Sequence, residues 1–104
     1  MTGKQGAFGI GGVPDGVWVD ARDERSYAKS HIPNAISIPF PRVDEMYPTI
    51  RDREIIIVYD SDYDDIVAKA ASKRMLELGH KDVYTLRGGI RAWERDGNPV
   101  VTGE

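Results

Sequence analysis

The sequence predicts an α/β fold, in which a central, mostly parallel β-sheet is flanked by helices. Short apolar runs rich in Val and Ile alternate along the chain with segments of helical periodicity, as in folds built from strand–helix units. The run Glu54–Tyr59 is apolar without alternation, which is typical of a central parallel strand covered on both faces. With 104 residues, the chain is expected to form one domain.

The first half of the chain divides into short elements separated by turn residues. Residues 1–13 contain five glycines, so we expect a flexible tail there and one domain over residues 14–104. Four elements are expected next, in the order strand, helix, strand, helix: Val17–Val19, Asp23–Lys29, Ala35–Ile38 and Arg42–Ile50. Pro33 lies in the turn before the second of these strands, and Pro39 ends that strand.

The second half carries the strongest periodic signals. After the strand Glu54–Tyr59, apolar residues near the 3.6 period predict a helix over about Asp65–Leu78, and Gly79 ends it. A strand over Val83–Leu86 and a helix over Ile90–Arg95 complete the pattern. In parallel sheets, ligands bind beyond the carboxyl ends of the strands. The four aspartates within the stretch 60–65 lie directly after the central strand, so this loop is the predicted functional site.

Composition excludes several classes of function. The chain has no cysteine, which excludes a disulfide framework, a thiolate-based zinc or iron–sulfur site and a cysteine nucleophile. Its 14 basic and 17 acidic side chains give a formal net charge of −3, which argues against nucleic-acid binding. No apolar run approaches the length of about 20 residues that crosses a membrane. We expect a cytoplasmic protein without a cofactor, as a monomer or weak dimer.

Three segments resemble the rhodanese family in order and spacing. The first is Val17–Arg22, a strand followed by Asp-x-Arg, with His31–Ala35 behind it as His-Ile-Pro-Asn-Ala. Ser30 stands where the family usually has glycine. The second is the strand Ile55–Tyr59 with its loop and long helix, and the third is the stretch 86–93, Leu-Arg-Gly-Gly-Ile-Arg-Ala-Trp.

The resemblance covers about Pro14–Val100 and implies a rhodanese-like three-layer fold with sulfurtransferase activity. In active members of the family, a cysteine follows the central strand and carries a persulfide. The N–H groups of the loop behind it bind the anionic sulfur donor. The resemblance also implies that four residues support this pocket: Asp20, Arg22, Arg87 and Gly88.

The loop of this chain differs at every position that carries the family's chemistry. It runs Asp60, Ser61, Asp62, Tyr63, Asp64, Asp65 and Ile66. Aspartate replaces the cysteine at position 60, Tyr63 replaces glycine, Asp65 replaces arginine and Ile66 replaces a small hydroxyl residue. A carboxylate cannot form a persulfide, and neighbouring acids repel an anionic donor. The sequence therefore predicts no catalytic residue and no sulfurtransferase turnover through this loop.

The acidic loop has a structural explanation that needs no ligand. The first turn of a helix has unpaired N–H groups and a partial positive charge. Asp60 is expected to place a carboxylate among these donors, where active members hold the thiolate. Asp62, Asp64 or Asp65 is expected to cap the helix or to lie in its first turn.

The functional hypothesis that we prefer is a binding or regulatory module, whose acidic loop receives a basic peptide or protein. The alternative is a sulfurtransferase family member whose loop has diverged or been engineered, since some members have a second cysteine at the position of Asp65. A weaker alternative is a Mg²⁺ or Ca²⁺ site at Asp60, Asp62 and Asp64, which have EF-hand spacing. Asp65 and Ala71, however, stand where that motif needs glycine and glutamate.

Another weak alternative is aspartate-based phosphotransfer. A strand followed by Asp-x-Asp resembles the first motif of haloacid-dehalogenase-type phosphatases, whose other motifs this chain lacks. Elsewhere, we expect His31 to have a packing and hydrogen-bonding role, His80 to be an exposed turn residue and Trp93 to pack the last helix on the core. Tyr63 is expected either to fill the pocket or to stand exposed as a contact residue.

Overall fold

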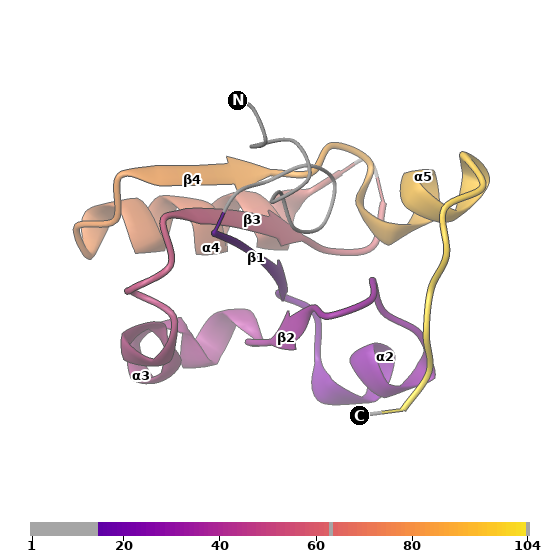
Figure 1. Cartoon of the computed structure of the whole chain (residues 1–104), viewed down its shortest axis with the longest axis horizontal. Helices are drawn as coiled ribbons and strands as arrows, with labels where there is room; N and C mark the ends of the chain where they lie inside the picture. The colour runs from indigo at the N-terminus through magenta and orange to yellow at the C-terminus, as the bar shows by residue number, and fades with distance from the viewer. Residues whose placement is uncertain (1–14, 63, 104) are drawn as a thin grey trace.

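The structure, a computed structural model, describes residues 15–62 and 64–103 (Figure 1). Its strands are β1 (Gly16–Asp20), β2 (Ile36–Ser37), β3 (Ile55–Tyr59) and β4 (Asp82–Thr85). Its α-helices are α2 (Glu24–Lys29), α3 (Val43–Met46), α4 (Ile66–Glu77) and α5 (Gly89–Arg95), and its 3₁₀-helices are η2 (Phe40–Arg42) and η3 (Tyr47–Thr49). The glycine-rich tail expected at residues 1–13 lies outside the described residues.

The four strands form one sheet in the order β2-β1-β3-β4, and every pairing between them is parallel. The register places Val17 opposite Ile56 and Val19 opposite Val58. The predicted α/β class with a central parallel sheet is confirmed. The central position of β3 follows from its sequence, because an uninterrupted apolar strand needs cover on both faces.

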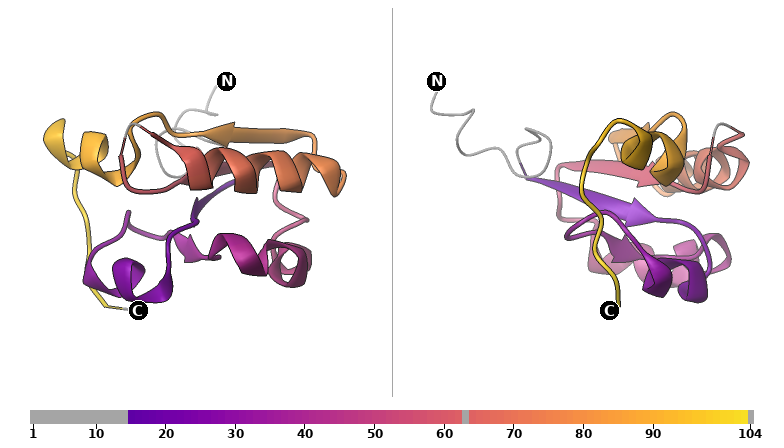
Figure 2. Two further views of the ribbon diagram at one scale, coloured as in Figure 1. Left: turned by 180° about the vertical axis from the view of Figure 1, so that it is seen from behind. Right: turned by 90° about the vertical axis from the view of Figure 1, so that its right-hand side faces the viewer.

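Two apolar clusters cover the two faces of the sheet. On one face, alternate residues of β1 and β3 pack against α3 and α4, with Ala68, Ala71 and Met75 as the buried contacts of α4. On the other face, Trp18 and Tyr59 pack with the segment around Ile32 and with α5. Figure 2 shows α4 lying across β3 and β4 when the molecule is seen from behind. The result is a three-layer arrangement.

Several element boundaries differ from the prediction. The second strand is only Ile36–Ser37, and the helix expected over Arg42–Ile50 is the short α3 with a 3₁₀ turn at each end. Pro41 and Pro48 explain these turns, since proline lacks the N–H that a continuous α-helix needs. The long helix begins at Ile66, because Asp65 has a left-handed backbone with φ of 52°.

The two histidines differ in how well the sequence predicted them. His31 is buried, stacks on the ring of Tyr27 and forms a hydrogen bond with the carbonyl of Tyr27, so its packing role is confirmed. The prediction for His80 was wrong. Its side chain is buried, with Nδ1 2.7 Å from the hydroxyl of Tyr47 and Nε2 3.2 Å from the carbonyl of Glu54. A turn residue can be buried when the turn folds back on the core.

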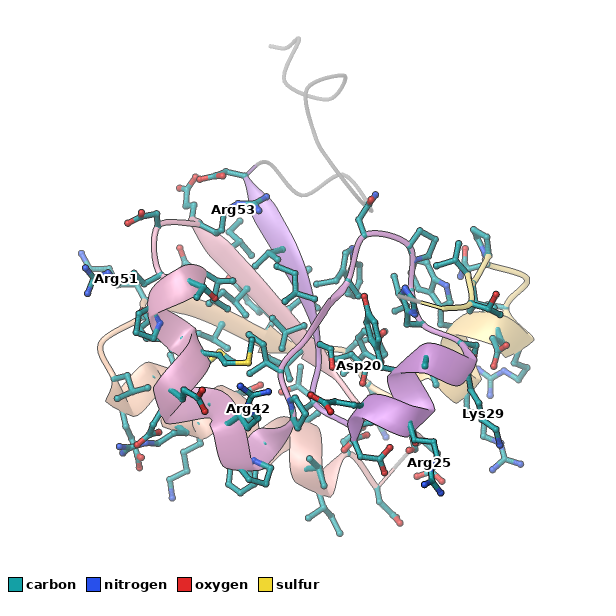
Figure 3. All side chains as sticks on the ribbon, turned by 90° about the horizontal axis from the view of Figure 1, so that it is seen from below. Asp20, Arg25, Lys29, Arg42, Arg51 and Arg53 are labelled. Carbon is teal, nitrogen blue, oxygen red and sulfur yellow. The ribbon has the colours of Figure 1, made fainter. Side chains whose placement is uncertain are left out.

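Trp93 packs α5 against the core, as predicted. Its ring meets that of Trp18 edge-on at 5.4 Å between centroids, and its Nε1 donates a hydrogen bond to the carbonyl of Pro99. Within the described part of the chain, no helix is long and apolar enough to span a membrane. Figure 3 shows Asp20 in the interior at the carboxyl end of β1, while Arg25 and Lys29 point outward from α2.

Candidate functional site

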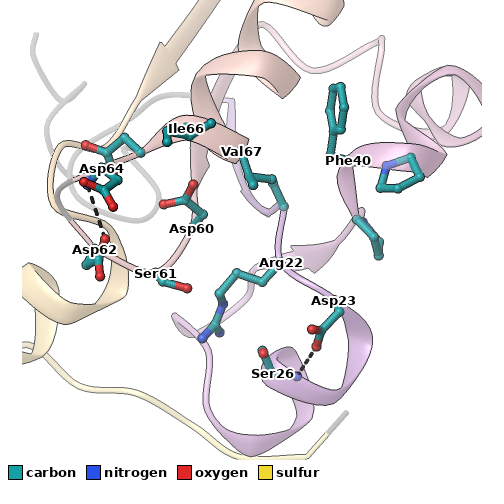
Figure 4. Close-up of a pocket in the computed structure, with 14 residues that line it drawn as sticks. Arg22, Asp23, Ser26, Phe40, Asp60, Ser61, Asp62, Asp64, Ile66 and Val67 are labelled. Atoms are coloured by element: carbon teal, nitrogen blue, oxygen red, sulfur yellow. Dashed lines mark hydrogen bonds between the residues drawn. The ribbon is translucent and has the colours of Figure 1, made fainter.

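A pocket of about 620 Å³ lies at the carboxyl end of the sheet, where the loops after β1, β2 and β3 meet (Figure 4). The loop between β3 and α4 supplies most of its acidic lining. The segment Pro39–Pro41 and the first residues of α4 supply apolar lining. The pocket is thus located where a parallel sheet places ligand sites, and where the predicted acidic loop lies.

Asp60 is fixed at the junction of β3 and α4. Its Oδ2 accepts a hydrogen bond of 2.8 Å from the N–H of Ala68, the third residue of α4. The residue is only 6% exposed, and its Oδ1 has no hydrogen-bond partner among the described residues. The carboxylate of Asp60 therefore accepts a backbone N–H of the first turn of α4, as the sequence predicted.

Burial raises the pKa of the Asp60 carboxyl above its ordinary value, because the charged form loses solvation. The N–H of Ala68 acts in the opposite direction by stabilising the carboxylate, and the charge of Asp65 raises the pKa further. Ionisation of Asp60 therefore lowers the stability of the folded state. A positive charge brought close to it would reduce that loss of stability.

Asp65 links the loop to a neighbouring segment. It is 2% exposed, and its Oδ2 accepts a hydrogen bond of 3.1 Å from the N–H of Gly88, before α5. Its Oδ1 has no partner among the described residues. Asp65, one of the three aspartates expected at the helix start, is the N-cap residue of α4, but its side chain makes no capping hydrogen bond to the helix. The left-handed backbone at this residue turns the carboxylate towards Gly88 instead.

Asp62 and Asp64 lie at the outer part of the loop. Asp64 is exposed and Asp62 half-buried, and the Oδ1 of Asp62 accepts the N–H of Asp64 at 3.2 Å. Neither lies in the first turn of α4, so the capping role expected for these residues falls to Asp60. Tyr63 lies outside the described residues. Over residues 15–62 and 64–103, no three acidic or histidine side chains are grouped to hold a metal ion, including the set Asp60, Asp62 and Asp64.

Asp20, which is buried, and Arg22, which is half-buried, form an ion pair beside the pocket. The Arg22 Nη2 lies 2.8 Å from the Asp20 Oδ2, and Nε lies 3.0 Å from Oδ1. Nη2 also donates to the carbonyl of Ser30 at 2.6 Å, so the pair ties β1 to the end of α2. Arg22 lines the pocket, but its charge is already balanced by the fully buried Asp20.

The other two residues that the resemblance marked as supporting the pocket lie farther round the loop. Gly88 holds Asp65 through its N–H. Arg87 is exposed and borders a separate hollow of about 290 Å³ together with Asp65, Lys69 and Thr85. Ile66 and Ser61 both line the main pocket and are exposed.

The sequence did not indicate the apolar wall of the pocket. Phe40 is 40% exposed between Pro39 and Pro41, and all three line the pocket beside Val67. The signal was present, because the Pro-Phe-Pro run follows a parallel strand and must lie at the same edge of the sheet. In the sequence, Pro39 indicates only the end of the strand.

Comparison with known proteins places this geometry in a family. The sequence model of the rhodanese-like domain matches residues 10–96. A thiosulfate sulfurtransferase GlpE of Coxiella burnetii is 31% identical over 80 residues, covering 77% of this chain and 73% of that protein. A tRNA uridine(34) hydroxylase of Pectobacterium atrosepticum is 34% identical over an alignment of 89 residues, which covers 79% of this chain but 24% of that protein.

Solved structures agree with the fold. The crystal structure of the BH2092 protein from Bacillus halodurans matches with a TM-score of 0.76 at 31% identity, over 85% of this chain and 64% of that chain. A rhodanese with anions from E. coli matches with a TM-score of 0.70 at 26% identity, over 85% of this chain and 99% of that chain. This chain therefore spans somewhat less than two thirds of the first of these structures and nearly all of the second.

Proposed function

This chain belongs to the rhodanese-like domain family, and we propose that it works by binding a positively charged peptide or protein segment rather than by transferring sulfur. The observation that carries the proposal is the position of Asp60. The residue that follows β3 is a buried carboxylate whose Oδ2 accepts the N–H of Ala68, and the whole sequence contains no cysteine. A persulfide needs a sulfur nucleophile at this point, and a carboxylate cannot replace it.

The charge around the pocket argues against an anionic sulfur donor. Arg22 is the one basic residue among the described residues that line the pocket, and its charge is balanced by Asp20. The acidic lining residues are Asp23, Asp60, Asp62, Asp64 and Asp65. A dianion such as thiosulfate would be repelled here. A cationic segment would be attracted, and attraction of this kind also increases the rate of encounter.

The apolar part of the lining supports a peptide or protein over an inorganic ion. Phe40, Val67 and Ile66 are 40%, 39% and 69% exposed, so the rim of the pocket presents apolar surface to solvent. Exposed aromatic and aliphatic side chains beside a charged hollow are typical of sites that bind another protein. The pocket thus combines negative charge with a surface against which a peptide can pack.

A titration with two matched peptides tests the proposal. Amide resonances of the isotope-labelled protein are followed on addition of acetyl-Ala-Arg-Leu-Arg-Ala-amide or acetyl-Ala-Glu-Leu-Glu-Ala-amide. We expect the basic peptide to shift resonances of residues that line the pocket in a saturable way, and the acidic peptide to leave them unchanged. Equal responses to both peptides, or shifts confined to other parts of the sheet, would overturn the proposal.

A further inference from the structure

We infer that the pocket recognises one arginine side chain of its partner, with the guanidinium group held over Asp60 and the aliphatic stem against Phe40 and Val67. The inference rests on the proposed function, because it names the chemical group through which a basic partner is bound.

The floor of the pocket contains a negative charge that the protein does not balance. Asp60 is 6% exposed, and its Oδ1 has no hydrogen-bond partner among the described residues. Asp62 and Asp64 also border a second hollow, of about 330 Å³, together with Arg91 and Arg95, so basic groups already face them. Asp60 therefore gains more than Asp62 and Asp64 from a cation that enters the main pocket, as does Asp65, whose Oδ1 also has no partner among the described residues, since an unpaired buried carboxylate oxygen is costly.

The wall beside this charge is apolar and partly aromatic. Figure 4 shows Val67 between Asp60 and Phe40, so the apolar wall and the carboxylate follow one another along the pocket, as the stem and the charged tip of an arginine side chain do. A guanidinium is planar, stacks on aromatic rings and is less strongly hydrated than an ammonium group. It also donates through a fork that matches a carboxylate. These properties favour arginine over lysine at this site.

The size of the hollow fits a side chain together with part of its backbone. Its volume of about 620 Å³ lies in the range of roughly 300–1,000 Å³ that is common for small-molecule sites. A bare divalent ion would leave most of this space unfilled. Within the described residues no group of three acidic or histidine side chains is arranged around a metal position, so the site suits an organic cation better.

Three amino-acid derivatives test the inference. The labelled protein is titrated with the N-acetyl amides of arginine, lysine and citrulline, which have similar stems and no net backbone charge. We expect binding of acetyl-arginine amide at millimolar concentration, with shifts at residues lining the pocket. We expect the affinity for the lysine derivative to be several-fold lower, and no saturable response to citrulline, which has the shape of arginine without its charge.

Two variants with matched controls locate the contact. Asp60→Asn should weaken binding of acetyl-arginine amide by about tenfold, because the charge-assisted hydrogen bond and the attraction are lost. Asp52→Asn removes the same charge from an exposed residue outside the pocket and should have little effect. Phe40→Ala should weaken binding several-fold, whereas Tyr84→Ala, at an exposed ring on β4, should not.

The outcomes separate the two levels of the proposal. If the basic pentapeptide binds at the pocket but acetyl-arginine amide does not, the single-residue site is overturned and the proposed function stands. Equal affinity for arginine and lysine, or an unchanged affinity in Asp60→Asn, also overturns the inference alone. If neither the pentapeptide nor the arginine derivative binds, both fail. If MgCl₂ at millimolar concentration shifts the same resonances and displaces acetyl-arginine amide, the pocket is a metal-ion site and the inference is overturned.

Discussion

Gly89 offers a sharp test of how the acidic loop is held. It begins α5 with φ of +58°, and a Cβ at this position would lie 2.8 Å from the carbonyl carbons of Asp60 and Ser61. This close approach allows the carbonyl of Asp60 to accept the N–H of Ile90 at 3.0 Å, and that of Ser61 to accept the N–H of Arg91 at 3.1 Å. We predict that Gly89→Ala separates α5 from the loop and strongly destabilises the domain.

The expected loss can be assembled from two contributions. A left-handed backbone costs an L-residue about 1–2 kcal/mol, and inserting an atom into a packed position typically costs about 1–3 kcal/mol. Together these give a loss of about 2–5 kcal/mol in the free energy of unfolding. In a domain of this size, each kcal/mol lowers Tm by about 4–8 °C, so Tm should fall by about 8 °C or more.

Gly79→Ala is the matched control. Gly79 has φ of +107°, and apart from Gly79 and its two chain neighbours no atom of the described residues lies within 4 Å of a Cβ built there. Alanine at this position therefore suffers backbone strain without a steric clash. Urea unfolding followed by circular dichroism measures both variants against the parent chain. A loss at Gly89→Ala no greater than that at Gly79→Ala would refute the close contact between α5 and the loop.

Three further predictions concern the charged residues of the site. Because the pKa of Asp60 is raised in the folded state, ionisation of this residue weakens folding. Its contribution is most favourable below the unfolded pKa and is lost as pH rises through the folded pKa. Urea unfolding should therefore show Asp60→Asn gaining stability relative to the parent from acidic to neutral pH; a constant difference would contradict the raised pKa. Asp20→Asn leaves the Arg22 guanidinium, 12% exposed, without its carboxylate and should cost about 3–5 kcal/mol in the same assay; a loss below about 1 kcal/mol would show that the pair behaves as a surface ion pair. Asp60→Cys places a thiol at the end of β3 but leaves Asp23, Asp62, Asp64 and Asp65 around the pocket, so attack of its thiolate on the outer sulfur of thiosulfate, with sulfite leaving, should give little persulfide. Intact-mass spectrometry measures the added sulfur, and persulfide on most of the folded variant would contradict the repulsion of the anionic donor.

Much of the fold was predictable because local pattern and tertiary environment agree. The apolar run of β3 has no alternation, and the structure covers it on both faces. The segment from Asp20 to Arg22 has the spacing for a local ion pair, and that pair forms. Where the outcome depended on packing between distant segments, the sequence was less informative. His80 is buried by Tyr47 and Glu54, which lie 33 and 26 residues away.

The site shows the same division. The position of Asp60 at the start of α4 follows from its place directly after the central strand. The sequence does not show that the side chain of Asp60, and not that of Asp65, accepts the N–H group of the first turn of α4. This outcome depends on the left-handed backbone at Asp65 and on the hydrogen bond between Asp65 and Gly88. Likewise, the apolar wall around Phe40 can be predicted only once β2 is known to be parallel to β1 and to end at the same edge of the sheet.

An assay of sulfur transfer from thiosulfate to cyanide tests most directly whether this chain, with Asp60 after β3, lacks the thiosulfate sulfurtransferase activity for which its GlpE relative is named. The chain as it stands, with no cysteine and a carboxylate at the end of β3, should give a rate equal to that of buffer alone. An active rhodanese assayed in parallel provides the positive control. Turnover comparable to that control, in a preparation shown by mass spectrometry to be free of other proteins, would contradict the claim that this domain acts without sulfur chemistry.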